Sequence, residues 1–427
     1  CAAAVALAAA LAGEAARRCA ERHEDIKSAF QSENAFYYSF YDQVVSAQSW
    51  RDGFGKLHVD ALSEALTPIN ALRRFNIYQE LLFGLLWRGL SWLTESPPDP
   101  TSFYCACVFT VYGLGLLAML AAAPRSIWSL LIAGALYYNN LEESSNVSYM
   151  PPLRENCGVP FWFASCASLV LLHERRQEST LWPRVLLVLS CTSFLLVWQF
   201  ACFALAMQVA SLYASALLGA ASWPFLVEAS KLYSASAVLS FALRFGDLWV
   251  LRSIFFWLSF TVAAVGHVLA GKISRGAVGP PATGAVLVAV FLAVRKGMLW
   301  AVALGGASLD DDSHIFEFLA FRLGLRKEAL GYHAALYEGQ RSFSPPAAHD
   351  WERLLETFLL PFAAASAAVV LAALLRAGRA ERQELFGHVI LLVLACATAV
   401  PFLLMMRYRM LLFPHLALLG SAAFDAR

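Results

Sequence analysis

The chain has 427 residues, of which 59% are hydrophobic and only 15% are charged, and its formal net charge is +1. Its mean hydropathy is +0.57. So much apolar surface cannot be hidden behind a polar shell in water, so the composition excludes a water-soluble globule and predicts an all-α polytopic membrane protein. The near-zero charge gives no reason to expect nucleic acid as a partner.

The apolar segments predict one transmembrane domain over residues 1–427 with about 12 membrane-spanning helices, because a span needs roughly 20 apolar residues. Residues 1–13 are expected to be the tail of a first span that follows a cytosolic leader, since the chain starts without methionine. The later spans are expected near residues 103–122, 127–138, 159–173, 185–197, 202–220, 234–243, 250–270, 284–304, 359–375, 389–405 and 410–423.

One leucine-rich segment, residues 81–93, carries Arg88 in its middle and predicts a helix lying in the membrane interface rather than crossing it. Basic clusters near residues 125, 173–184, 272–275 and 376–382 fall at alternate ends of the spans, and the positive-inside rule assigns them to the cytosol. Four segments should then face the opposite compartment, which is the endoplasmic reticulum lumen in a eukaryotic cell. They are a first loop at 14–95, a second at 139–158, a long loop at 305–353, and residues 406–409.

These expected lumenal segments contain acids and arginines. Glu33 stands among aromatic residues, and Glu143 and Arg154 flank a rigid Pro-Pro pair. Arg407 and Arg409 come last. Acids and cations at one membrane face suit group transfer from a lipid phosphate, because arginine binds phosphate through a forked set of donors. The alternatives are a solvated acid in an interfacial aromatic belt and arginines that only contact lipid headgroups.

Metal binding is the less favoured hypothesis for the run Asp310-Asp311-Asp312-Ser313-His314. Hard divalent ions take carboxylate oxygens, but three consecutive acids cannot all point at one ion, and Asp312 or Ser313 would serve equally as a helix N-cap. We therefore predict no metal site. The nine cysteines lack metal-finger spacing, and a disulfide between Cys19 and Cys157 stays open.

The pair Arg295-Lys296 falls in the middle of an expected span. Charges at that depth are costly unless they line a wet cavity, so a role toward a lipid phosphate or another substrate is one hypothesis and a misplaced span boundary is the other.

The segment Glu33-Asn34-Ala35-Phe36-Tyr37-Tyr38-Ser39-Phe40-Tyr41 resembles the Glu-x-Gly-Leu-Tyr-Tyr-Ser-Tyr signature of the tryptophan C-mannosyltransferases, the dumpy-nineteen-like family. Similar segments follow in order at residues 72–80, 151–155, 198–200, 311–315 and 406–415. Matches in the same order over most of the chain are far more specific than any one of them.

The resemblance implies a GT-C glycosyltransferase fold in the endoplasmic reticulum membrane with a lumenal active site. It implies transfer of mannose from dolichyl-phosphate-mannose to C2 of a tryptophan indole, in Trp-x-x-Trp segments of secretory polypeptides, with inversion and without a metal or another cofactor. The partners would be the polypeptide acceptor, the dolichol-linked sugar and membrane lipids.

The family's catalytic acid, carried onto Glu33, would be the general base, because the attacking indole must lose its C2 proton to regain aromaticity. We expect the donor phosphate to be bound by Arg407, Arg409, His314 and Arg154. Further active-site candidates are Tyr37, Tyr38, Asn76, Glu143, Asp311 and Asp312.

The chain departs from the family pattern at several positions. Ala35 replaces a glycine, Gln79 replaces a proline, and residues 140–147 lack a histidine and an arginine of the pattern. Family members continue beyond Pro414-His415 into a further span and a soluble lumenal domain. We expect that domain to be absent here, either because the sequence is truncated or because this is a divergent form with altered acceptor selection. Two alternatives stay open: a non-catalytic membrane scaffold of the same fold, and a transporter of a lipid-linked substrate, for which no paired half-repeats are detectable in the sequence.

Overall fold

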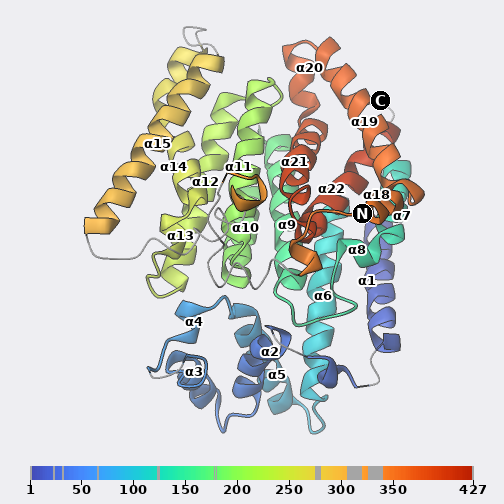
Figure 1. The fold of residues 1–427 in the computed structure, drawn as a ribbon, viewed down its shortest axis with the longest axis vertical. Coiled ribbons are helices and arrows are strands. Elements are labelled where there is room, and N and C mark those ends of the chain that lie inside the picture. The colour runs from blue at the N-terminus through green and yellow to red at the C-terminus, as the bar shows by residue number, and fades with distance from the viewer. Residues whose placement is uncertain are drawn as a thin grey trace.

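The structure is a computed structural model that describes residues 2–22, 25–30, 33–64, 67–122, 126–176, 178, 180–274, 280–304, 320–325 and 340–425. Within these ranges the secondary structure is helical, and the only β pairing is an isolated bridge between Asp60 and Ile69. The all-α prediction is therefore confirmed. Figure 1 shows two parts: a bundle of long helices, and a layer of short helices lying across one end of it.

The layer consists of α2, α3, α4 and α5, drawn in blue in Figure 1. Their bounds are α2 (Glu33–Val45), α3 (Trp50–His58), α4 (Ala71–Arg74) and α5 (Tyr78–Leu93). Helix α5 coincides with the segment predicted to form an interfacial helix. Hydrogen bonds dock the layer on the bundle; in two of them Asn76 donates to the Leu195 carbonyl at 2.7 Å, and the Tyr78 hydroxyl donates to the Leu243 carbonyl.

The bundle contains both long and shorter apolar helices. Its members are α1 (Ala2–Arg22), α6 (Pro100–Ala121), α7 (Ile127–Asn139), α9 (Glu155–Glu174), α10 (Trp182–Val197), α11 (Ala201–Leu217), α12 (Trp223–Leu243), α14 (Ile254–Ser274), α15 (Pro280–Leu304), α19 (Leu359–Arg376), α21 (Phe386–Phe402) and α22 (Arg409–Ser421). In the described part of the chain, four helices are long and apolar enough to cross a membrane, namely α6, α9, α12 and α19. The larger number of spans stays a prediction.

Short elements join these helices. They are η1 (Ile26–Ala29), α8 (Leu141–Ser144), α13 (Trp249–Arg252), η2 (Arg341–Phe343), α18 (Ala348–Glu356), α20 (Arg379–Glu384), η3 (Met406–Tyr408) and η4 (Ala422–Phe424).

Helix α12 differs most from the sequence-based expectation of a span at 234–243. It begins at Trp223, where the Ser222 side chain accepts a hydrogen bond from the backbone N–H of Phe225 and a proline occupies the first turn. The charged Glu228 lowered the apparent hydropathy of this first part. In the structure that charge is neutralised, because Arg184 Nε lies 2.6 Å from the Glu228 carboxylate.

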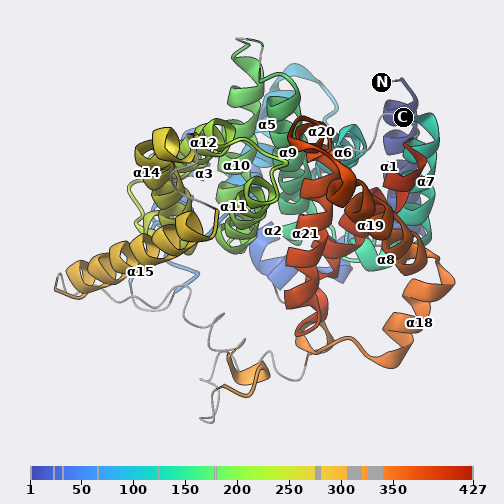
Figure 2. The ribbon, with the colours of Figure 1, turned by 90° about the horizontal axis from the view of Figure 1, so that it is seen from above.

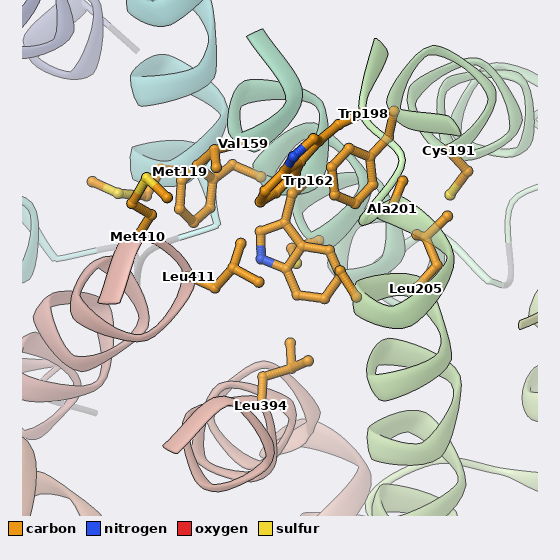
Figure 3. Packing of buried hydrophobic residues seen from close by; sticks show 14 of the residues in the cluster. Met119, Val159, Trp162, Cys191, Trp198, Ala201, Leu205, Leu394, Met410 and Leu411 are labelled. Atoms are coloured by element: carbon orange, nitrogen blue, oxygen red, sulfur yellow. The ribbon is translucent and has the colours of Figure 1, made fainter. Parts of the chain in front are cut away.

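The core of the bundle surrounds α9, as Figure 3 shows for the residues around Trp162. Trp162 is fully buried, and Leu411 of α22 and Leu205 of α11 belong to the same cluster. Helices α6 and α9 approach closely at Gly115, where a Cβ atom would lie only 2.5 Å from Pro160. This contact fixes the position of the first turns of α9, which carry the polar residues described below.

Helix α15 stands at the edge of the bundle and projects from it in Figure 2. Arg295 is half-buried and Lys296 is exposed on this helix. The mid-span charges therefore lie on a peripheral helix and not on one in the centre of the bundle.

Candidate active site

Glu33 and Arg154 come together at the end of the bundle that carries the layer. Glu33 is the first residue of α2 and its side chain is 45% exposed, whereas the side chain of Arg154, directly before α9, is only 5% exposed. Arg154 Nη2 lies 3.9 Å from Glu33 Oε1. The first turn of a helix also favours a negative charge, because its free N–H groups point toward it. The result is an accessible carboxylate beside a buried, permanently charged cation.

Tyr37 holds the Arg154 guanidinium in place. Arg154 Nη2 donates a hydrogen bond to the Tyr37 hydroxyl, and the guanidinium carbon lies 3.7 Å from the centre of the Tyr37 ring. Tyr37 follows Glu33 by one helical turn, so both side chains lie on the same face of α2. Burial raises the pKa of Tyr37 to about 12, so its hydroxyl remains protonated at neutral pH.

Tyr38 is buried against α6 instead. Its hydroxyl lies 2.8 Å from Thr101 Oγ1, and its ring packs edge-on against that of Tyr104 with centroids 5.4 Å apart. Burial raises the pKa of Tyr38 to about 12. The tandem tyrosines thus separate: Tyr37 contacts Arg154, while Tyr38 anchors α2 to the bundle.

Arg88 holds the other end of α2. Its Nη1 atom donates to the carbonyls of Val44, Val45 and Ala47 at 3.1, 3.3 and 2.7 Å. The last carbonyls of a helix have no partner within the helix, and a cation there also complements the helix dipole. The charge in the middle of α5 therefore has a structural role in orienting the helix that carries Glu33.

Glu155, the residue after Arg154, connects α9 with the turn at η3. Its Oε2 atom lies 3.3 Å from Arg407 Nη2, with 3% of the Glu155 side chain and 27% of the Arg407 side chain exposed. The Arg407 guanidinium lies 5.3 Å from the centre of the Phe343 ring. Two consecutive residues at the start of α9 thus link two segments that are far apart in the chain.

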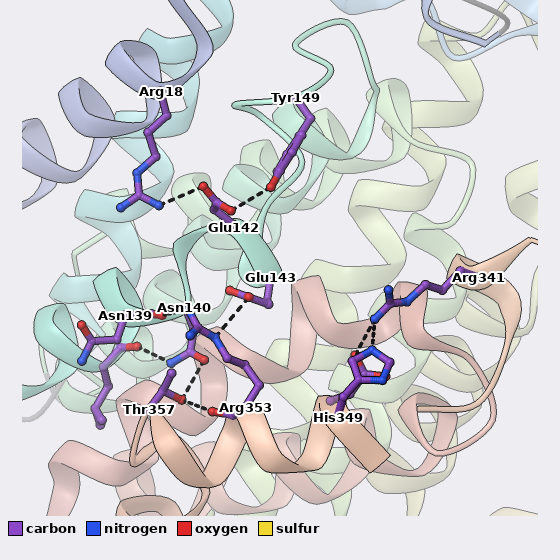
Figure 4. Close-up of polar contacts among 12 residues, drawn as sticks. Arg18, Asn139, Asn140, Glu142, Glu143, Tyr149, Arg341, His349, Arg353 and Thr357 are labelled. Atoms are coloured by element: carbon purple, nitrogen blue, oxygen red, sulfur yellow. Dashed lines mark hydrogen bonds and ion pairs between the residues drawn. The ribbon is translucent and has the colours of Figure 1, made fainter. Parts of the chain in front are cut away.

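Arg409 is the first residue of α22 and is half-buried. Within the described part of the chain it forms neither a hydrogen bond nor an ion pair, although the charges of Glu143 and Asp350 act on it. Glu143 itself pairs with Arg353 at 3.4 Å, as Figure 4 shows. Arg407 and Arg409 therefore differ, since only Arg407 is already paired with an acid.

A polar network beside these residues joins the second loop to α1 and α18 (Figure 4). Glu142 accepts from Arg18 at 3.1 Å and from the Tyr149 hydroxyl at 2.8 Å. The Thr357 hydroxyl donates to Asn140 Oδ1 at 2.9 Å. Despite its departures from the family pattern, this loop is held by contacts from both sides.

The remaining predicted residues fall into two groups. Asn76 is fully buried and docks the layer on α10, so the structure gives it a packing role. Asp311, Asp312 and His314 lie outside the described residues. Among the residues that are described, no three His, Cys, Asp or Glu side chains form a group that could hold a metal. Cys19 and Cys157 are free thiols, so the disulfide that the sequence left open is not formed.

Sequence reasoning treated Glu80 as part of a motif and missed it as a site residue. Glu80 is fully buried; the Tyr104 hydroxyl donates to its Oε1 at 3.2 Å and accepts from Gln79 Nε2 at 2.8 Å. Burial raises the pKa of Glu80 to about 7, against the opposing effect of the Arg154 charge. The sequence could have indicated Glu80 as a buried acid, because it lies on the apolar face of α5.

The fold resembles that of solved membrane oligosaccharyltransferases. An apo crystal structure of the Archaeoglobus fulgidus oligosaccharyltransferase matches with a TM-score of 0.64 over 97% of this chain and 50% of that one, at 13% identity. The archaeal oligosaccharyltransferase AglB from the same organism, solved with an inhibitory peptide and a dolichol-phosphate, matches with a TM-score of 0.61 at 12% identity over 92% of this chain and 46% of that one. The chain therefore shares the fold of these oligosaccharyltransferases over most of its length.

Residues 21–426 match the family model Dpy19, described as Q-cell neuroblast polarisation, and the chain belongs to this family. It is 26% identical to the C-mannosyltransferase dpy-19 of Caenorhabditis briggsae, over 91% of this chain and 61% of that protein. It is also 26% identical to the mouse protein C-mannosyl-transferase DPY19L1, over 92% of this chain and 57% of that protein. The resemblance of the motifs is thus confirmed, and the chain spans less than two thirds of the length of these relatives.

Proposed function

We propose that this chain carries the catalytic site of a protein C-mannosyltransferase, which transfers mannose from dolichyl-phosphate-mannose to C2 of tryptophan indoles in Trp-x-x-Trp segments. The observation that carries the proposal is the exposed Glu33 carboxylate 3.9 Å from the buried Arg154 guanidinium, in a member of the Dpy19 family. A base that acts on a polypeptide must be accessible, and a group that binds phosphate must carry a fixed positive charge. This pair has both properties.

In the proposed reaction the indole C2 attacks the anomeric carbon of mannose, and the bond from that carbon to the phosphate oxygen breaks. The phosphate leaves with the bonding electrons on the face opposite the attack, so the anomeric configuration inverts. The indole is then cationic, and the Glu33 carboxylate accepts its C2 proton, which restores aromaticity. Phosphate is a good leaving group, so the reaction proceeds without a metal or another cofactor.

Arginine side chains would stabilise the negative charge that grows on the leaving phosphate. Arg154 has two N–H groups, at Nε and Nη1, that are buried without a hydrogen-bond partner among the described residues. Arg409 is the second ligand that we propose, because its guanidinium is unpaired in the described structure. Arg407 would contribute after exchanging part of its contact with Glu155 for the phosphate. His314 stays a proposed ligand outside the described residues.

We place the protein in the endoplasmic reticulum membrane as a multi-pass protein with this site on the lumenal side. Support comes from the clustering of the expected lumenal segments: the start of α2, the residues before α9 and the turn at η3 all meet at one end of the bundle. Arg184 belongs to an expected cytosolic cluster, and it pairs with Glu228 in the first half of α12. The other end of α12, at Leu243, is bonded to the layer, so the expected cytosolic cluster lies away from the layer.

Two other functions predict different outcomes. A scaffold of the same fold would not need the free N–H groups of Arg154. A transporter of a lipid-linked substrate is disfavoured, because its best feature in the sequence, Arg295-Lys296, lies on the peripheral helix α15 with Lys296 exposed.

The test is a transfer assay with purified protein, dolichyl-phosphate-mannose and a Trp-x-x-Trp peptide, read by mass spectrometry for one added hexose on tryptophan. We expect addition that persists in EDTA and disappears in Glu33→Gln. A well-folded protein that binds the peptide but adds no hexose would support the scaffold and contradict the proposed reaction.

A further inference from the structure

The ion pair between Glu155 and Arg407 has the opposite asymmetry to the pair between Glu33 and Arg154. Here the acid is enclosed and the cation is open, since 3% of the Glu155 side chain is exposed against 27% of the Arg407 side chain. Arg407 Nη2 lies 3.3 Å from Glu155 Oε2. A ligand that enters from outside therefore meets the Arg407 guanidinium before it meets the carboxylate behind it.

The second loop holds the other oxygen of Glu155. Asn146 Nδ2 donates to Glu155 Oε1 at 3.4 Å, and the same nitrogen lies 3.6 Å from the sulfur atom of Met410. A buried carboxylate is costly unless it is hydrogen-bonded, and Asn146 supplies a bond that does not depend on Arg407. Glu155 can therefore stay in place while Arg407 turns toward another anion.

A phosphate and a carboxylate compete for the same donors of an arginine, because the planar guanidinium binds either group through its forked N–H groups. In the proposed reaction the phosphate changes its charge. The donor is a phosphodiester, whereas the product, dolichyl phosphate, is a monoester with a charge of about −1.5 to −2 at neutral pH. The product should therefore bind the arginines more tightly than the donor does, and it would block a site that held no competing anion.

We propose that Glu155 competes with the lipid phosphate for Arg407, and that this competition sets how readily the phosphate monoester leaves the site. Asn146 is a positioning residue, which keeps the carboxylate in place during the exchange so that Arg407 returns to it when the product departs. The inference rests on the proposed function for the identity of the ligand, a lipid-linked phosphate.

The test is the equilibrium binding of dolichyl phosphate to the purified protein in detergent, which needs no mannose transfer. We expect Glu155→Gln to bind the lipid about 10-fold more tightly than the wild type, because Arg407 loses its competitor. In an Arg407→Gln background the same substitution should change the affinity less than about 2-fold. An unchanged or weaker affinity in Glu155→Gln would overturn the inference. An equal gain in both backgrounds would overturn it too, since the gain would then come from the general field of the removed charge.

Two further variants complete the measurement. Glu228→Gln is the matched control, because it also removes an arginine-paired carboxylate but in the first half of α12, and it should leave the affinity unchanged. Asn146→Leu should weaken the binding about 3-fold, because the carboxylate then depends on Arg407 alone and holds it more strongly. An unchanged affinity in Asn146→Leu would remove Asn146 from the exchange.

Transfer kinetics separate this inference from the proposed function. In an active protein, Glu155→Gln should lower the inhibition constant of dolichyl phosphate by about 10-fold, a change that a merely structural role of Glu155 would not produce. If the wild type binds dolichyl phosphate but transfers no mannose, the proposed function fails, and the affinities of the variants still decide the inference. If the wild type and Glu155→Gln both fail to bind the lipid, the inference is overturned as well.

Discussion

Arg154 Nη2 lies 3.9 Å from Glu33 Oε1, although one residue precedes a helix of the bundle and the other begins a helix of the layer. The cation is buried and the acid is exposed, so the pair is not a simple structural salt bridge. An ion pair whose acid faces water contributes little to stability. Because of this asymmetry, the Glu33 carboxylate stays accessible to a substrate.

Replacing Glu33 by Gln should reduce mannose transfer by about 10²–10⁴-fold and leave Tm nearly unchanged, because the variant loses the proton acceptor but keeps the shape of an exposed side chain. Mass spectrometry of the product peptide measures the first effect. The matched control is Asp42→Asn, which removes an exposed acid from the same helix. Comparable loss of transfer in both variants would show that the charge of α2, and not a base at Glu33, is required.

Replacing Arg407 by Gln should destabilise the protein by about 1–3 kcal/mol, because it leaves the buried Glu155 carboxylate without its charged partner. The same change at Arg409 should cost about 0.5 kcal/mol or less, since that side chain is not paired in the described structure. Thermal unfolding of the two variants measures the difference. Adding Glu155→Gln to Arg407→Gln should recover part of the loss, and a failure to recover it would mean that the pair is not the cause.

Arg407→Gln and Arg409→Gln should rank in the opposite order when the loss of donor affinity is measured instead of the loss of stability. Arg409→Gln should weaken the binding of dolichyl-phosphate-mannose more than Arg407→Gln, because a charge already held by Glu155 has less to gain from the phosphate. A binding measurement with the intact donor checks this order. Equal affinity in Arg409→Gln and the wild type would remove Arg409 from the proposed phosphate site.

The contribution of Glu80 to the stability of the protein should fall as pH rises from about 4.5 to about 7. Its folded-state pKa is raised by burial from 4.5 to about 7, so the folded state binds more protons than the unfolded state over this range. The stabilisation is fully present below pH 4.5 and is lost by the time pH passes 7, with a total of about 3 kcal/mol. Thermal unfolding across this range should show a shallower slope for Glu80→Gln, and identical slopes would contradict the raised pKa.

Replacing Gly115 by Ala should destabilise the bundle by about 1–3 kcal/mol, even though alanine favours helix formation. The new Cβ would lie 2.5 Å from the Cα of Pro160, which cannot move without shifting α9. The control is Gly89→Ala in α5, where a Cβ meets nothing within 4 Å and the substitution should be neutral or stabilising. Equal effects of the two changes would show that α6 and α9 can separate at little cost.

The class of the protein, most helices and the family follow from the sequence, because hydropathy, helical periodicity and motif order are local properties of the chain. Segment 81–93 was correctly assigned as a helix from its leucine spacing. The span expected at 234–243 was too short, because hydropathy counts Glu228 as a cost and cannot include its pairing with Arg184.

Glu33, Arg154 and Arg407 could be selected from the sequence as residues capable of the chemistry, but their pairing was decided only by tertiary structure. Glu155 binds Arg407, and the buried Glu80 lies within electrostatic reach of Arg154. The physical reason is that the strength of a charge interaction depends on distance and on burial, and both are set by how helices far apart in the chain pack together. A sequence names the charged groups, whereas the packing of α2, α5 and α9 determines which of them are exposed, paired or left free to react.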